Sequence, residues 1–106
     1  MTFGETIREY RLKSRFRQKE VADLVKKENG ETITAQYLND LEHDRRNPPP
    51  PFIIEQLASV LNINAYLLYH LAGKIPLDIR SVQTDREAII RAYKNLHKQL
   101  SKKAAA

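Results

Sequence analysis

The chain has 106 residues and a formal net charge of +5, which suits one small domain with an appended segment. It has no cysteine, which excludes a disulfide framework and a thiolate metal site, and its histidines, His43, His70 and His97, are too widely spaced for a metal-ligand motif. No apolar run approaches the ~20 residues of a membrane span, and the N-terminus is too polar for a signal peptide. We therefore expect a cytoplasmic protein that does not interact with membranes.

The positive charge is unevenly distributed along the chain. Residues 1–47 hold 10 Lys/Arg and 9 Asp/Glu, whereas residues 80–106 hold 7 and 2. The overall charge therefore gives little indication that the N-terminal half binds nucleic acid. Any such binding would depend on a local basic patch.

The first helix is predicted from about Phe3 to Ser14. Its apolar residues recur at i, i+4 and i+7, which is the period of a helix with one face in a core. Arg11 continues the same stripe, and an arginine on an inward face requires a partner. A second helix begins near Arg17 or Gln18. Its C-terminal end is ambiguous, because residues 26–28 can extend it by a turn.

The run TAQYLNDLEHDRRNP, residues 34–48, predicts a third helix followed by a basic loop and a proline stop. Thr34 suits the helix N-cap, because its hydroxyl can accept a hydrogen bond from a free backbone N–H. The outer face is small or polar, and it carries Ala35, Gln36, Asn39 and Asp40. Amides can read adenine edges and the guanidinium groups of Arg45 and Arg46 can hold phosphates, so the run suits DNA. An ordinary surface helix with a basic loop fits the same residues about equally well.

Two further helices are predicted after the proline run. Pro51 suits the first turn of one, and Asn62 can end it in the left-handed conformation. Asn64 suits the N-cap of the next, which ends at Gly73. No segment alternates like a β-strand, so the predicted fold class is all-α.

Residues 74–83 are predicted to connect this domain, residues 1–79, to a C-terminal helix within residues 80–106. Thr84 and Glu87 have the spacing of a capping box. The helix then carries an a/d seam of about two heptads, formed by Ile89, Tyr93, Leu96 and Leu100. This stripe can fold back on the domain, pair with its copy in a second chain or contact another protein, and we favour pairing. The tail from Ala104 to Ala106 is expected to fray.

Four of these segments resemble, in order, the helix-turn-helix domain of the phage repressor and Cro type, also called the xenobiotic-response-element family. They are FGETIREYR, QKEVA, TAQYLNDLEHDRRNP and LASVLNI. The resemblance covers about residues 3–79. It implies a five-helix, lambda-repressor-like domain whose third helix enters the major groove of double-stranded DNA, with the C-terminal helix appended.

The resemblance also implies roles for individual residues. Base-reading positions are Thr34, Ala35, Gln36, Asn39 and Asp40, and phosphate-contacting positions are Arg17, Gln18, Tyr37, Arg45, Arg46 and Asn47. Gln36 and Asn39 are the best candidates for adenine contacts, and packing inside the domain is an equally good interpretation of Tyr37. Arg11 and Glu42 match a buried ion pair with a structural role.

Two departures from the family pattern bear on how the domain docks on DNA. An insertion of about six residues, within Lys26–Thr32, separates the second and third helices and leaves the docking angle open. Asp44 replaces the usual glycine after the third helix, where aspartate tolerates a left-handed backbone better than most residues.

We expect a sequence-specific transcriptional regulator of the nucleoid, specifically a dimeric repressor on a palindromic operator. The alternative is an antitoxin-like or other protein-binding module that uses the C-terminal helix to bind a regulatory protein. The sequence contains no nucleophile–base pairing, no metal-ligand spacing and no glycine-rich phosphate loop, so we expect neither enzymatic activity nor a cofactor.

Overall fold

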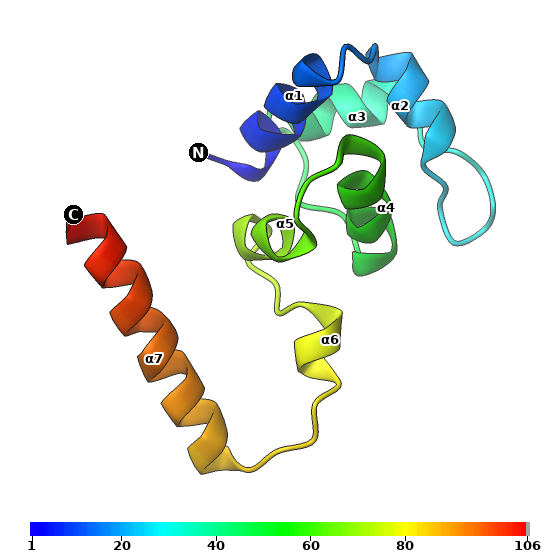
Figure 1. Ribbon diagram of the computed structural model, residues 1–106. Helices are drawn as coiled ribbons and strands as arrows, with labels where there is room; N and C mark the ends of the chain where they lie inside the picture. Colours follow the sequence, from blue (N-terminus) through cyan, green and yellow to red (C-terminus); the bar gives the residue numbers. More distant parts are fainter. Residues whose placement is uncertain (106) are drawn as a thin grey trace.

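The computed structural model describes residues 1–105, which form seven α-helices (Figure 1). The helices are α1 (Phe3–Lys13), α2 (Gln18–Leu24), α3 (Ala35–Glu42), α4 (Pro51–Leu61), α5 (Ala65–Leu71), α6 (Leu77–Arg80) and α7 (Arg86–Ala105). The predicted all-α class is confirmed. Within the described range the only β-type pairing is an isolated bridge between Lys26 and Thr32.

Helices α1–α5 pack around one hydrophobic core, and we call them the body. The predicted inward faces are buried, and their most enclosed members include Ile7, Leu38, Leu41, Ile54, Leu57 and Leu68. Tyr69 is also fully buried, which the sequence did not indicate. Its hydroxyl donates a hydrogen bond to Glu55 Oε1 at 2.9 Å, so the one polar atom of the side chain is satisfied.

The sequence correctly predicts the helix ends at which a nearby side chain or backbone conformation caps the helix. Thr34 Oγ1 accepts from the Tyr37 N–H at 3.0 Å and Asn64 Oδ1 accepts from the Tyr66 N–H at 2.9 Å. Asn62 has a φ of 54° and Asp44 a φ of 55°, so both adopt the left-handed conformation that the sequence suggested.

The segment between α2 and α3 is a hairpin, so residues 26–28 do not extend α2, whose end the sequence left ambiguous. The Lys27 N–H donates to the Glu31 carbonyl at 2.7 Å, and Gly30 turns the chain with a φ of 90°. Gln56, on α4, holds the base of the hairpin, accepting from the Lys26 N–H at 2.7 Å and donating to the Lys26 carbonyl at 2.6 Å. The inserted segment, Lys26–Thr32, is therefore fixed to the body where it begins.

Helices α1 and α3 approach each other closely at Gly4. A Cβ at this position would collide with the backbone oxygens of Leu41 and Glu42. The Gly4 N–H donates to Asp44 Oδ1 at 3.0 Å, and the Thr2 hydroxyl donates to Asp44 Oδ2 at 2.6 Å. The start of α1 thus fixes the loop that leaves α3.

The C-terminal part differs from the sequence prediction in two details. The predicted connector contains the short helix α6, and the N-terminal cap of α7 is Asp85 instead of Thr84. Asp85 Oδ1 accepts from the Ala88 N–H at 2.7 Å, which makes Arg86 the first helical residue. The helix continues through Ala105, and the last residue of the predicted frayed tail, Ala106, lies outside the described range.

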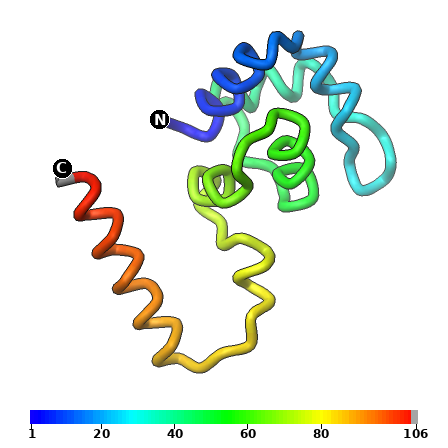
Figure 2. Tube along the Cα trace, in the orientation of Figure 1, coloured from blue at the N-terminus to red at the C-terminus, as the bar shows by residue number. Residues whose placement is uncertain are grey.

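Helix α7 stands apart from the body (Figure 2). Its seam residues, Ile89, Tyr93, Leu96 and Leu100, are 45–53% exposed, so the body does not cover them. No helix within residues 1–105 is both long enough and apolar enough to cross a membrane.

Candidate DNA-binding surface

The N-terminus of α2 and the outer face of α3 form one surface, because the two helices pack against each other (Figure 1). Gln36 is exposed on this surface, and Ala35, Asn39 and Asp40 are half-buried along the same face. Thr34 is exposed at the helix start, where its hydroxyl is engaged as the N-cap. The structure therefore brings Ala35, Gln36, Asn39 and Asp40 to one side of α3, with Thr34 at the start of the helix.

Asp40 connects this face to the loop that follows α3. Its Oδ1 accepts from Gln36 Nε2 at 3.0 Å and from Arg45 Nε at 3.2 Å, and its Oδ2 lies 3.9 Å from Arg46 Nε. Exposed ion pairs of this kind contribute only about 0–1 kcal/mol to stability. Their consequence is electrostatic, because two guanidinium groups offset the carboxylate and leave the local patch positive.

Tyr37 joins the surface to the core. Its half-buried ring packs against the core cluster, and the Arg46 guanidinium lies 4.9 Å from the ring centroid. Burial raises the pKa of Tyr37 above its ordinary value, and Arg46 opposes this shift only in part. The phenol therefore keeps its proton at neutral pH and its hydroxyl can donate to a phosphate oxygen.

The remaining phosphate-contact candidates border the same surface. Arg17 is exposed at the N-cap of α2, where its backbone N–H donates to Glu20 Oε1 at 2.8 Å. Gln18 is the first residue of α2, and Asn47 is exposed in the loop after α3.

Beneath the surface, Arg11 and Glu42 form a buried, bidentate ion pair. Arg11 Nε donates to Glu42 Oε2 at 2.6 Å, and Arg11 Nη2 donates to Glu42 Oε1 at 2.9 Å. Arg11 Nη1 donates to the Phe16 carbonyl at 2.8 Å, which ties in the turn before α2. The pair therefore fixes α3, α1 and the α1–α2 turn relative to one another.

Gln18 extends this ion pair toward the surface. Its Nε2 donates to Glu42 Oε1 at 3.1 Å and to Asn39 Oδ1 at 3.0 Å. A continuous polar chain thus runs from Arg11 through Glu42 and Gln18 to Asn39, which is the outermost member.

Sequence reasoning missed the long-range contacts that position α3. Gly4 and Asp44 set the distance between α1 and α3, and Gln56 fixes the hairpin that precedes α3. Gly4 is followed by an apolar helical pattern, a signal compatible with close packing, but its partners lie about forty positions away in the sequence.

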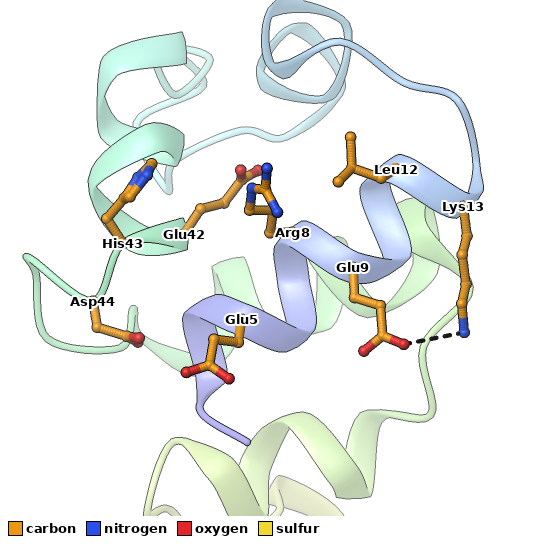
Figure 3. A pocket seen from close by; sticks show the side chains of 8 residues that line it. All are labelled: Glu5, Arg8, Glu9, Leu12, Lys13, Glu42, His43 and Asp44. Carbon is orange, nitrogen blue, oxygen red and sulfur yellow. Dashed lines mark ion pairs between the residues drawn. The ribbon is translucent and has the colours of Figure 1, made fainter.

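A surface hollow with a volume of about 800 Å³ lies beside the end of α3 (Figure 3). Both acidic and basic side chains line it, and a surface ion pair joins Lys13 Nζ to Glu9 Oε1 at 3.3 Å. Its lining is Glu5, Arg8, Glu9, Leu12, Lys13, Glu42, His43 and Asp44. The mixture of charges favours no single ligand class, and no group of metal-binding side chains occurs within residues 1–105.

A sequence model of the family described as Helix-turn-helix matches residues 7–68. Among solved structures, a chain in the SinR protein/SinI protein complex is similar to this one, with a TM-score of 0.53 and 16% sequence identity. The similarity covers 97% of this chain and 95% of that chain, and at this identity it concerns the fold alone. No curated protein sequence matches the chain.

Proposed function

We propose that this chain is a dimeric repressor that binds a palindromic operator. It belongs to the helix-turn-helix family and is a DNA-binding transcription regulator. The family match confirms the resemblance carried by the sequence motifs. The observation that carries the finer proposal is the surface described above, on which amide side chains of α3 are flanked by arginines of the following loop. Amides suit base edges and guanidinium groups suit phosphates, so the surface has the two kinds of contact that specific binding needs.

In the proposed complex, α3 lies in the major groove. Gln36 and Asn39 read base edges, while Thr34 and Ala35 offer methyl groups to thymine. Asp40 keeps Arg45 and Arg46 at the rim of this face, where they hold the phosphate backbone. Arg17, Tyr37 and Asn47 complete the contacts with the backbone on both sides of the helix.

The charge pattern of α7 supports pairing between two copies of the chain. At 100° per residue, the positions beside the central part of the seam are Ile90, Ala92, His97 and Gln99, which carry no formal charge, while Arg86 and Lys103 flank the seam at its two ends. The cations Arg91, Lys94, Lys98 and Lys102 lie on the opposite side of the helix. Along the central turns, two copies of α7 can therefore bring their apolar seams together without placing like charges against each other.

A dimer held together by α7 would present two copies of α3 to the same face of DNA. Helix-turn-helix dimers of this kind read half-sites about one helical turn, roughly 34 Å, apart. Repression follows if such a site overlaps a promoter, because the bound dimer covers the DNA.

The second candidate is a partner-binding module that uses α7, and one observation favours it. The SinR protein/SinI protein complex is an assembly of two differently named proteins, and its similarity to this chain extends over nearly the whole length, α7 included. The exposed seam of α7 is equally suited to an apolar helix supplied by another protein.

The proposal is tested by selecting DNA fragments from the source genome with the purified chain at near-physiological salt, while sedimentation gives its oligomeric state. We expect a short inverted repeat bound by two chains. The double variant Gln36→Ala, Asn39→Ala is the matched control, and it should dimerise equally well but select no repeat. Weak binding by a monomer, abolished by salt and without sequence preference, would favour the partner-binding function instead.

A further inference from the structure

The hydrogen bonds that link Arg11, Glu42, Gln18 and Asn39 determine whether the oxygen or the nitrogen of the Asn39 amide is free. Glu42 is ion-paired with Arg11 and presents only acceptor atoms, so the Gln18 atom 3.1 Å from Glu42 Oε1 is the amide nitrogen, Nε2. The two hydrogens of Nε2 are then both committed, one to Glu42 and one to Asn39. Rotating the Gln18 amide by half a turn would place its oxygen against the carboxylate.

The same reasoning fixes Asn39. A nitrogen donor of Gln18 requires an acceptor opposite it, so Asn39 turns Oδ1 toward α2 at 3.0 Å. The amide nitrogen Nδ2 is on the other side of Cγ and points away from α2. Asn39 therefore presents a hydrogen-bond donor, Nδ2, at this surface. Its orientation is set by the Arg11–Glu42 ion pair, which acts through Gln18.

We infer that Asn39 is a specificity-determining residue that donates from Nδ2 to a base acceptor in the major groove, and that Gln18 is its positioning residue. This inference rests on the proposed DNA-binding function and names the base chemistry that one residue reads. Guanine suits the free Nδ2 best, because O6 and N7 are both acceptors, while adenine offers N7 and thymine offers O4. Cytosine presents its N4 donor in the major groove, so it would place a donor against a donor.

It also follows that the Gln18 side chain does not contact a phosphate. A phosphate oxygen needs a donor, and both side-chain donors of Gln18 are already used within the protein. Its substitution should therefore change the preference for one base pair, whereas loss of a phosphate contact would weaken binding to all sequences alike.

The test is competitive selection from operator libraries that are randomised one base pair at a time. Asn39→Ala identifies the base pair that Asn39 reads, because preference disappears there. In Gln18→Met, which keeps the length of the side chain but has no amide, we expect discrimination against cytosine at that base pair to fall from about tenfold to about twofold. All other positions should keep their preferences.

Asn39→Asp provides a second variant that leaves Gln18 intact. Aspartate can still accept from Gln18 Nε2, but it presents an acceptor to the DNA, so we expect the preference at the same base pair to move toward cytosine. Gln83→Met is the matched control, because Gln83 is exposed in the connector before α7, and its preferences should equal those of the unmodified chain.

Two results would overturn the inference while leaving the proposed function intact. One is a Gln18→Met protein that binds every sequence more weakly by the same factor with its cytosine discrimination unchanged. The other is an Asn39→Asp protein with no shift toward cytosine. Failure of the unmodified chain to select any sequence would instead overturn the proposed function, and this inference with it.

Discussion

The body and α7 carry apolar residues at the same helical spacing but use them differently. In the body, residues such as Ile7 and Leu57 are fully buried, because neighbouring helices pack over them. In α7, Leu96 is 45% exposed and Tyr93 is 53% exposed, with the same periodicity and similar side chains. Periodicity thus shows which face of a helix is to be covered, whereas the covering element must be found elsewhere in the structure.

The two regions also differ in their polar contacts. The body has long-range hydrogen bonds that cross between helices, such as Arg11 to Glu42 and Lys26 to Gln56. Among the described residues, the side-chain hydrogen bonds of α7 are local, including Asp85 with the Ala88 N–H and Ser101 with His97. The body is therefore complete as one chain, and we expect α7 to be completed by a second copy.

The largest effect is expected in the body, at the buried ion pair. Glu42→Ala leaves the Arg11 guanidinium buried without its carboxylate, so the free energy of unfolding should fall by about 3–5 kcal/mol, measured by urea denaturation. The double variant Arg11→Met, Glu42→Met removes both charges and should recover most of this loss. A decrease below about 1 kcal/mol in Glu42→Ala would show that the pair does not hold the body together.

The next effect is expected at α7. Leu96→Asp places a charge in the seam, so sedimentation should show monomers, and operator affinity should fall by about 100-fold because the two half-sites are no longer linked. Asn95→Asp adds the same charge one residue earlier, away from the seam, and this variant should remain dimeric. An unchanged sedimentation profile for Leu96→Asp would remove α7 from the dimer contact.

A smaller effect is expected on the DNA-binding surface, where it should differ between base and phosphate contacts. Gln36→Ala should cost about 1–3 kcal/mol on the operator and relax preference at one base pair. Arg45→Ala should weaken operator and random DNA by similar factors and make the salt dependence shallower. Equal losses on both DNAs for both variants would refute this division of roles.

The smallest effect concerns pH and the buried Tyr69. Burial raises its pKa to about 12, with the hydrogen bond to Glu55 adding to the shift. Between pH 10 and about 12 the unfolded chain loses this proton while the folded chain keeps it, so stability should fall across this window. The Tyr69→Phe variant lacks this titration. The free energy of unfolding of the unmodified chain should therefore approach that of Tyr69→Phe as pH rises through the window. A difference that stays constant with pH would show that the pKa of Tyr69 is not raised in the folded chain.

The parts of the fold that the sequence predicts are those determined by neighbouring residues. Thr34 and Asn64 cap helices within their own turn, and Asn62 and Asp44 adopt the left-handed conformation that asparagine and aspartate tolerate. At α7 the same local signal is ambiguous, because Thr84 and Asp85 are adjacent and both suit an N-cap, and Asp85 takes the position.

The features that the sequence misses depend on distant partners. Gln56 holds the hairpin before α3 from 30 positions away, and the partner of the Tyr69 hydroxyl is 14 positions away. The same holds for the candidate site. The sequence indicates that Asn39 is polar and on the outer face, but its orientation depends on Gln18, which lies 21 positions earlier.

The most direct test of this division between body and α7 is a titration of the selected operator, and of a single half-site, with the unmodified chain and with Leu96→Asp. We predict that the unmodified chain binds the operator cooperatively as two copies, while Leu96→Asp fills each half-site independently and keeps the same base preferences. Cooperative binding by Leu96→Asp, or loss of its base preferences, would contradict the account, because pairing and reading would then not reside in separate parts of the chain.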